Sequence, residues 1–162
     1  NKTRLLIASG YWTNIDLTTD DRFKMPTDSA ENKLMVSVHY VDNAMYWTNR
    51  IGGQAWLDYS KEQCELLKKA FTDKGIPVFV GECTSIYEDE RFAADATHTD
   101  STECLSIMYD MMLDYGFVPV LWDVNKNFYS RTEYRINSDS DRALIAELSK
   151  ELAEKNAEKT AA

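Results

Sequence analysis

The segment Ile76–Glu82, which reads IPVFVGE, has the clearest strand pattern in this sequence. Its β-branched and aromatic residues do not alternate with charged ones, and such a run is typical of a strand that is buried on both faces of a sheet. Three further runs have the same character: Leu5 to Ser9, Lys33 to Tyr40 and Phe117 to Val124. The sequence therefore predicts four buried strands.

The segments between these runs have helical periodicity. One helix is predicted to begin at Ser60, which forms a capping-box pattern with Gln63, and to end before Gly75. Two more are predicted from about Ser101 to Tyr115, and from the Ser138–Ser140 region to Leu152. Strands that alternate with helices at intervals of roughly 40 residues favour an α/β fold, with a parallel sheet and right-handed crossovers. We expect one domain over residues 1–152, and a helix end or disordered tail over 153–162.

The composition restricts the class of partner. The 162 residues carry a formal net charge of −9, which argues against nucleic acid or an anionic membrane surface, because both need a basic face. A neutral polysaccharide is compatible with this charge. Three cysteines without CxxC spacing predict neither a disulfide framework nor a zinc site. Cys64 and Cys104 are expected to be buried free thiols, and nothing singles out Cys83 as a nucleophile. Two distant histidines predict no metal site. The first residues lack the long apolar region of a secretory leader, and no cofactor is expected.

The carboxyl ends of the strands are where an α/β protein builds its site. Read in order, they carry Tyr11 and Trp12, then His39, then Glu82, then Trp122. A carboxylate that ends a buried apolar strand is costly unless it is hydrogen-bonded or functional, so Glu82 is the leading candidate. The alternatives are that Glu82 caps a loop or pairs with an arginine such as Arg91, and that His39 and Trp122 are core residues.

These residues, taken with their spacing, resemble glycoside hydrolase family 5, which contains retaining β-1,4-glucanases. The resemblance covers nearly the whole chain and concerns the last four βα units of a (β/α)8 TIM barrel. It lies in four segments, which read GYWTNID with FKMPTD (10–16 and 23–28), NKLMVSVHY (32–40), KGIPVFVGE (74–82) and VLWD (120–123). The resemblance implies the C-terminal half of a TIM barrel with four parallel βα units.

The same resemblance implies a role for each matching residue. Glu82 is the nucleophile of a double displacement, Tyr40 orients it, and His39 contacts the sugar at the cleavage point. Trp122 stacks beneath that sugar. Further sugar platforms are expected on the two long loops, 11–32 and 41–59, with packing of the loops as the alternative; these residues are Tyr11, Trp12, Trp47 and Trp56.

The second carboxyl group of a retaining glycosidase is not found by this resemblance. The family takes its acid/base from an Asn-Glu pair at the end of the fourth barrel strand, and no Asn-Glu pair follows a strand here. Asp16 and Asp123 are the nearest substitutes, and neither fits well. Residues 41–44, reading VDNA, also depart from the family's usual sequence after the His-Tyr pair. The natural β-glycan is therefore left open, and the parent enzyme is expected to be extracellular.

A half-barrel should expose the apolar interior of the barrel and two sheet edges. The residues expected to include this surface are Met35, Val36, Val78, Phe79, Val80 and Val120. We expect a partner to cover it, either a complementary N-terminal half or a second copy of the chain. Three alternatives stay open: a non-catalytic half-barrel that associates with itself, an open flavodoxin-like sheet, and an unrelated α/β binding domain.

Overall fold

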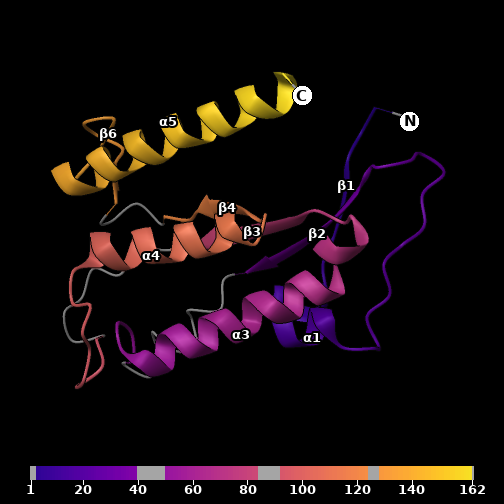
Figure 1. Cartoon of the computed structure of the whole chain (residues 1–162), viewed down its shortest axis with the longest axis horizontal. Helices are drawn as coiled ribbons and strands as arrows, with labels where there is room; N and C mark the ends of the chain where they lie inside the picture. Colours follow the sequence, from indigo (N-terminus) through magenta and orange to yellow (C-terminus); the bar gives the residue numbers. More distant parts are fainter. Residues whose placement is uncertain (1–2, 40–49, 84–91, 124–127, 162) are drawn as a thin grey trace. The chain divides into compact units, whose positions relative to one another are not determined.

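A computed structural model describes residues 3–39, 50–83, 92–123 and 128–161 of the chain, with side chains to residue 158. The chain divides into two compact units, Asn1–Trp122 and Asp123–Ala162. The first holds a four-stranded parallel sheet in the order β1-β2-β3-β4 (Figure 1). The predicted strands are present, with shorter bounds: β1 Leu6–Ala8, β2 Leu34–His39, β3 Val78–Cys83 and β4 Val118–Leu121.

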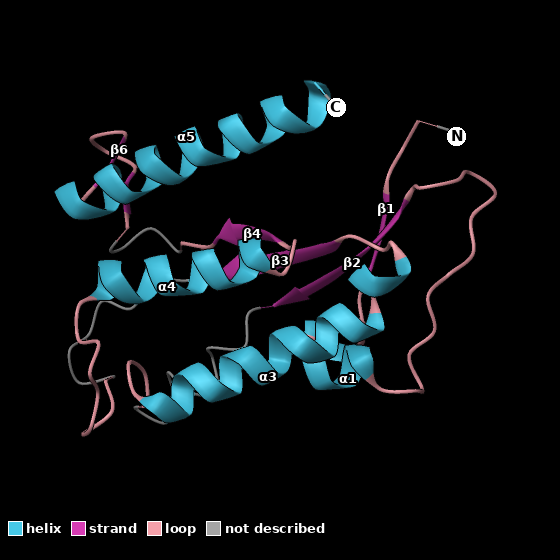
Figure 2. Cartoon of the chain, in the orientation of Figure 1, coloured by secondary structure: helices cyan, strands magenta, loops and turns pink. Residues whose placement is uncertain are grey.

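The helices of the first unit follow the strands in sequence. A 3-10 turn η1 (Tyr11–Thr13) and a short helix α1 (Ile15–Thr19) follow β1, and the long helix α3 (Gln54–Ala70) with the 3-10 turn η2 (Thr72–Lys74) precedes β3. Helix α4 (Ser101–Asp114) precedes β4, as Figure 2 shows. Its bounds confirm the predicted helix of 101–115, and Asp100 caps it by accepting a hydrogen bond from the Glu103 N–H at 2.8 Å.

The predicted start of α3 at Ser60 is wrong. The helix begins at Gln54 after Gly53, and Ser60 lies inside it with 0% exposure. Gln63 does not form a capping box, because its side-chain amide donates to Asp16 Oδ1 of α1 at 2.9 Å. The end of the helix agrees with the prediction, since Gly75 adopts the left-handed conformation (φ 74°) that glycine tolerates best.

The two faces of the sheet differ. Register pairs Val36 with Val78 and Val38 with Val80, and these four valines are 0–1% exposed. We call this side, with Cys83, the covered face; Cys83 Sγ lies 3.5 Å from Met112 Sδ of α4. Alternation places the following residues on the other side, which we call the open face: Ile7, Met35, Ser37, His39, Phe79, Val118 and Val120.

Several side chains on the open face are exposed to solvent, whereas those on the covered face are buried. Ile7, Val118 and Val120 are 55%, 47% and 36% exposed. Six apolar residues were predicted to include those of this surface, but three of them, Val36, Val78 and Val80, belong to the covered face. The reason is that consecutive strand residues point to opposite sides, so a run that is apolar throughout supplies both faces at once.

The second unit contains a hairpin and a helix. Strands β5 (Tyr129–Ser130) and β6 (Arg135–Ile136) pair antiparallel, and α5 runs over Asp139–Ala161. Arg142 joins them by donating to the Ile136 and Asn137 carbonyls, the latter at 3.2 Å. The sequence predicted one domain to residue 152 and a frayed or disordered tail. In the structure the sheet-bearing unit ends at Trp122, and residues 153–161 continue α5.

Candidate functional site

His39 and Glu82 meet at the carboxyl ends of β2 and β3. They are cross-strand partners, and His39 Nδ1 lies 3.1 Å from Glu82 Oε2. Both side chains are about one third exposed, at 35% and 32%. This distance allows a hydrogen bond when the imidazole nitrogen carries a proton. The pair therefore combines a carboxylate and a titratable imidazole that both remain accessible to a ligand.

A β-bulge turns Glu82 toward His39. In β3, Val78 and Val80 lie on the covered face, so strict alternation would turn residue 82 to that face too. The register shifts after Val80, so that His39 pairs with Glu82 instead of Gly81. Bulges of this kind often occur beside active sites, where they redirect a side chain.

Aromatic side chains lie on the two outer strands. Trp122 follows β4 and is 41% exposed, and its backbone N–H donates to the Cys83 carbonyl at 2.7 Å. Tyr11 and Trp12 follow β1, are 73% and 80% exposed, and have ring centroids 5.9 Å apart. The strand order therefore puts exposed aromatic residues on each side of the His39–Glu82 pair.

The turn that carries Tyr11 and Trp12 is tightly built. Trp12 and Thr13 have φ of 58° and 53°, an unfavourable region for such side chains. Gly10 lies against α1, because a Cβ there would be 2.5 Å from Thr18 Oγ1, and its N–H donates to that oxygen. Asn14 caps α1 by accepting from the Leu17 N–H at 3.0 Å. These contacts hold two exposed aromatic rings on a strained backbone.

One predicted site residue that the structure describes, Trp56, does not join this group. Trp56 was expected on a loop as a sugar platform, and this is wrong: it lies in α3 with 0% exposure, where no sugar ring can stack on it. Trp56 lies in the first turn of α3, before the predicted helix start at Ser60, and this explains the error. Tyr40 and Trp47 lie outside the described residues.

The alternative acids have other partners. Asp16 accepts the hydrogen bond from Gln63, and Asp123 Oδ2 accepts from the Tyr129 N–H at 3.1 Å. Cys83 is buried like Cys64 and Cys104, and the three are free thiols. Burial, with some help from Glu65, raises the pKa of Cys64 to about 12, so this thiol stays protonated at neutral pH. Across the described segments, no cluster of three potential metal ligands occurs and no helix is long and apolar enough to span a membrane.

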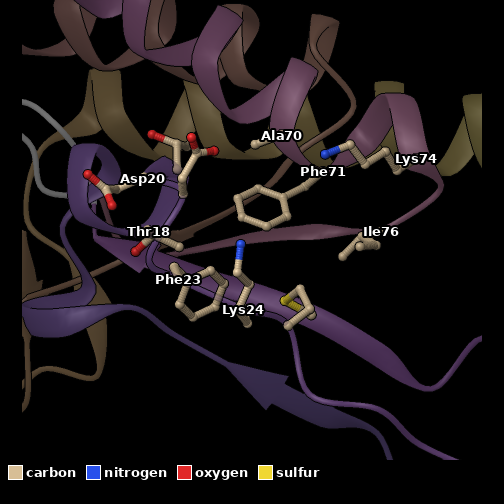
Figure 3. Close-up of a pocket in the computed structure, with 11 residues that line it drawn as sticks. Thr18, Asp20, Phe23, Lys24, Ala70, Phe71, Lys74 and Ile76 are labelled. Atoms are coloured by element: carbon tan, nitrogen blue, oxygen red, sulfur yellow. The ribbon is translucent and has the colours of Figure 1, made fainter.

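A pocket of about 320 Å³ lies elsewhere (Figure 3). Phe23 and Phe71 line it with ring centroids 6.2 Å apart, beside Lys24, Lys74 and Ile76. Lys74 and Ile76 precede β3, whereas Glu82 lies near its carboxyl end, roughly 20 Å further along at about 3.3 Å per residue. This pocket is therefore separate from the His39–Glu82 pair.

Comparison with known proteins identifies the family and the fold of the chain. Residues 1–128 match the family model described as Cellulase (glycosyl hydrolase family 5). A GH5-4 broad specificity endoglucanase from an uncultured bovine rumen ciliate is 29% identical with a TM-score of 0.72, over 87% of this chain and 46% of that one. Another from Bacteroides salanitronis is 26% identical with a TM-score of 0.67, over 88% of this chain and 42% of that one.

A family 5 xyloglucanase from Paenibacillus pabuli has the same fold, with a TM-score of 0.73 at 21% identity, over 90% of this chain and 49% of that one. The chain thus spans less than half the length of these solved structures, and its sheet supplies four parallel strands. The predicted half-barrel is confirmed, and the open flavodoxin-like sheet is not supported. The chain belongs to glycosyl hydrolase family 5, the cellulase family, and carries half of its TIM barrel.

Proposed function

We propose that this chain is the C-terminal half of the catalytic barrel of a retaining endo-β-1,4-glucanase, with Glu82 as nucleophile. The observation that carries the proposal is the His39–Glu82 pair at 3.1 Å, at the carboxyl ends of adjacent strands in a chain of this family. Parallel-barrel enzymes build their active sites at this end of the strands. A carboxylate that is partly exposed there is accessible to the anomeric carbon of a bound sugar.

Each remaining predicted site residue has a part in this reaction. Glu82 attacks the anomeric carbon and forms the glycosyl-enzyme bond while the leaving-group oxygen takes a proton from the acid/base carboxyl group. His39 contacts the sugar at the cleavage point and fixes the Glu82 carboxylate, and Tyr40 orients the nucleophile. Trp122 offers its exposed ring to the C–H face of that sugar. Tyr11, Trp12 and Trp47 serve as further sugar platforms.

The acid/base carboxyl group comes from the other half of the barrel. A retaining mechanism needs two carboxyl groups about 5–5.5 Å apart, and the substitutes Asp16 and Asp123 are held by Gln63 and the Tyr129 N–H. The completing half also covers the open face, where Ile7, Val118 and Val120 are exposed. One assembly step therefore supplies both the missing proton donor and the missing packing.

The substrate class is a β-glucan of the plant cell wall, cleaved outside the cell. Similar structures include a lichenase, a mutant of it bound to cellotetraose, and xyloglucanases, which supports a glucan with β-1,4 linkages. The net charge of −9 suits a neutral polymer better than a polyanion.

A covalent label tests the nucleophile. The chain is combined with a segment that carries the first four βα units, and the mixture is treated with a 2-fluoro-cellobioside inactivator. Mass spectrometry should find one sugar on the peptide that contains Glu82. The variant Glu82→Gln should keep its fold, take no label and lose at least about 10⁴-fold in kcat, because attack on the anomeric carbon needs the carboxylate.

A second His–Glu pair in the same chain provides the matched control. His98 Nδ1 lies 2.9 Å from Glu103 Oε1 near the start of α4. Glu103→Gln removes the same charge from the same kind of pair, and we expect full labelling and near-normal activity. A label on another residue, or an active Glu82→Gln assembly, would contradict the assignment.

The second candidate function is non-catalytic: a half-barrel that associates with another copy of itself. It is favoured by the exposed side chains of Ile7, Val118 and Val120 on the open face and by the unpaired edges of β1 and β4 in the described sheet. Glycan binding by such a dimer would be weak at most. The variant Val120→Asp, which places a charge on the open face, distinguishes this state from the catalytic assembly.

A further inference from the structure

The bulge in β3 leaves two residues opposite one. Val38 pairs with Val80 and His39 pairs with Glu82, so Gly81 is the extra residue of the bulged strand. Side chains at both bulge positions point toward the same side of the sheet as the residue they oppose. Gly81 and Glu82 therefore share the place on the open face that faces His39.

The side chains of Phe79 and Ser37 occupy the space next to Gly81. A Cβ at Gly81 would lie 3.0 Å from Phe79 Cε1, 3.5 Å from Phe79 Cδ1 and 3.5 Å from Ser37 Oγ. Phe79 and Ser37 are themselves cross-strand partners on the open face. A side chain at residue 81 would have to push the Phe79 ring aside or shift its own backbone, and the adjacent residue that such a shift moves is Glu82.

The other side of the strand holds the register. Cys83 is 2% exposed on the covered face, with Sγ 3.5 Å from Met112 Sδ and 3.8 Å from the Val80 carbonyl oxygen. Loss of the bulge without loss of a residue would exchange the faces of Glu82 and Cys83. It would bury an unpaired carboxylate under α4, which is strongly unfavourable. The strand therefore keeps its bulge, and strain at residue 81 should be relieved by a change in the aim of Glu82.

We propose that Gly81 is a positioning residue. Because Gly81 has no side chain, the bulge can direct Glu82 toward His39 without a clash with Phe79. The geometric part of this inference stands on the described strands alone. Its catalytic consequence rests on the proposed function, with Glu82 as nucleophile. The substitution Gly81→Ala should then lower kcat without weakening substrate binding, because the sugar platforms are untouched.

The two histidines of the chain allow a test that needs no activity. In nitrogen-15 and proton NMR spectra of the 162-residue chain, Glu82→Gln defines the shift of the His39 imidazole signals on loss of the carboxylate. Gly81→Ala should move these signals at least halfway to the Glu82→Gln position. The His98 signals should stay in place, since their partner Glu103 lies on α4.

A second substitution supplies the rescue. Phe79→Leu removes the ring atoms that lie 3.0 and 3.5 Å from the added methyl group. The double variant Phe79→Leu/Gly81→Ala should bring the His39 signals back to those of Phe79→Leu alone. If Gly81→Ala does not fold, the double variant still tests the inference, and its folded state is read from unchanged His98 signals.

The outcomes separate this inference from the proposed function. In the assembled barrel, Gly81→Ala should lower kcat about 100-fold with little change in KM, the loss typical of a displacement near 1 Å, and Phe79→Leu should restore most of it. His39 signals that stay at wild-type positions in Gly81→Ala, or that are not restored in the double variant, would overturn the inference. Failure of the inactivator to label Glu82 would overturn the proposed function and leave the NMR result standing.

Discussion

The covered and open faces of one sheet show which part of this sequence serves folding and which part serves a partner or substrate. On the covered face Val36, Val38, Val78 and Val80 are 0–1% exposed, and on the open face Val118 and Val120 are 47% and 36% exposed. The residue type is the same on both. The same apolar residues therefore form strands on both faces, and packing against helices determines which face is buried and which stays available to a partner or substrate.

The largest effect should come from placing the same charge on each face. Val80→Asp puts an unpaired carboxylate on the covered face, which costs about 4 kcal/mol or more out of a typical stability of roughly 5–15 kcal/mol. We expect this variant to lose its cooperative urea transition or to express as aggregate. Val120→Asp places the carboxylate where water reaches it, and we expect a change in unfolding free energy within about 0.5 kcal/mol.

The same pair of variants tests self-association. Sedimentation velocity of the wild-type chain should show dimers or larger species, and Val120→Asp should shift them toward monomer because the open face becomes charged. Equal destabilisation by Val80→Asp and Val120→Asp would show that both faces are packed. A wild-type chain that sediments only as monomer would eliminate the self-associating candidate.

The strands and α4 could be predicted because each depends on local pattern. Runs such as Leu34–His39 leave little choice but a buried strand, and the Asp100 cap with Gly116 marks both ends of α4. The start of α3 could not be predicted, because Ser60 looks like a cap and its burial depends on tertiary packing. Trp56 was misassigned for the same reason.

The candidate site was predictable in part. The order His39, Glu82, Trp122 at strand ends follows from the spacing of the strands. The face that Glu82 takes does not, because alternation from Val80 assigns it to the covered face and only the bulge at Gly81 reverses this. A glycine inside a strand is a sequence signal for a bulge, and Gly81 is such a signal here.

A smaller effect should distinguish the two glycines with positive φ that lie before and after α3. Gly52 has φ +80° and a Cβ there would lie 1.9 Å from the His98 carbonyl oxygen, while its own carbonyl accepts from the Thr97 and His98 N–H groups at 3.0 Å. Gly75, which ends the 3-10 turn η2 that follows α3, has φ +74°, and a Cβ there would have nothing within 4 Å. Both positions carry the cost of a left-handed residue, but only Gly52 also has a steric obstacle.

We therefore expect Gly52→Ala to lower the unfolding free energy by about 3 kcal/mol, as strain is added and two hydrogen bonds weaken. Gly75→Ala should cost only about 1 kcal/mol. Urea titrations of both variants measure the difference directly. Equal losses would mean that the contact between Gly52 and the segment 97–98 does not contribute to stability.

The smallest effect should come from an ion pair that lies on neither face. Arg22 donates from Nε to Asp20 Oδ1 at 2.7 Å, and its hydrogen bonds lower the pKa of Asp20 from 3.8 to about 2. A carboxyl group with a lowered pKa in the folded state stabilises the fold above its ordinary pKa, and that contribution is lost as pH falls from about 4 toward 2. Because the pair is exposed, the contribution at neutral pH should be slight. Arg22→Ala should therefore lower the urea midpoint a little at pH 6, and the difference from wild type should shrink as pH falls from about 4 toward 2. If the difference in urea midpoint grew on acidification, Arg22 would act through a group other than Asp20. A large difference at pH 6 would mean that exposed residues contribute more to stability, relative to the covered face, than the burial of the four valines indicates.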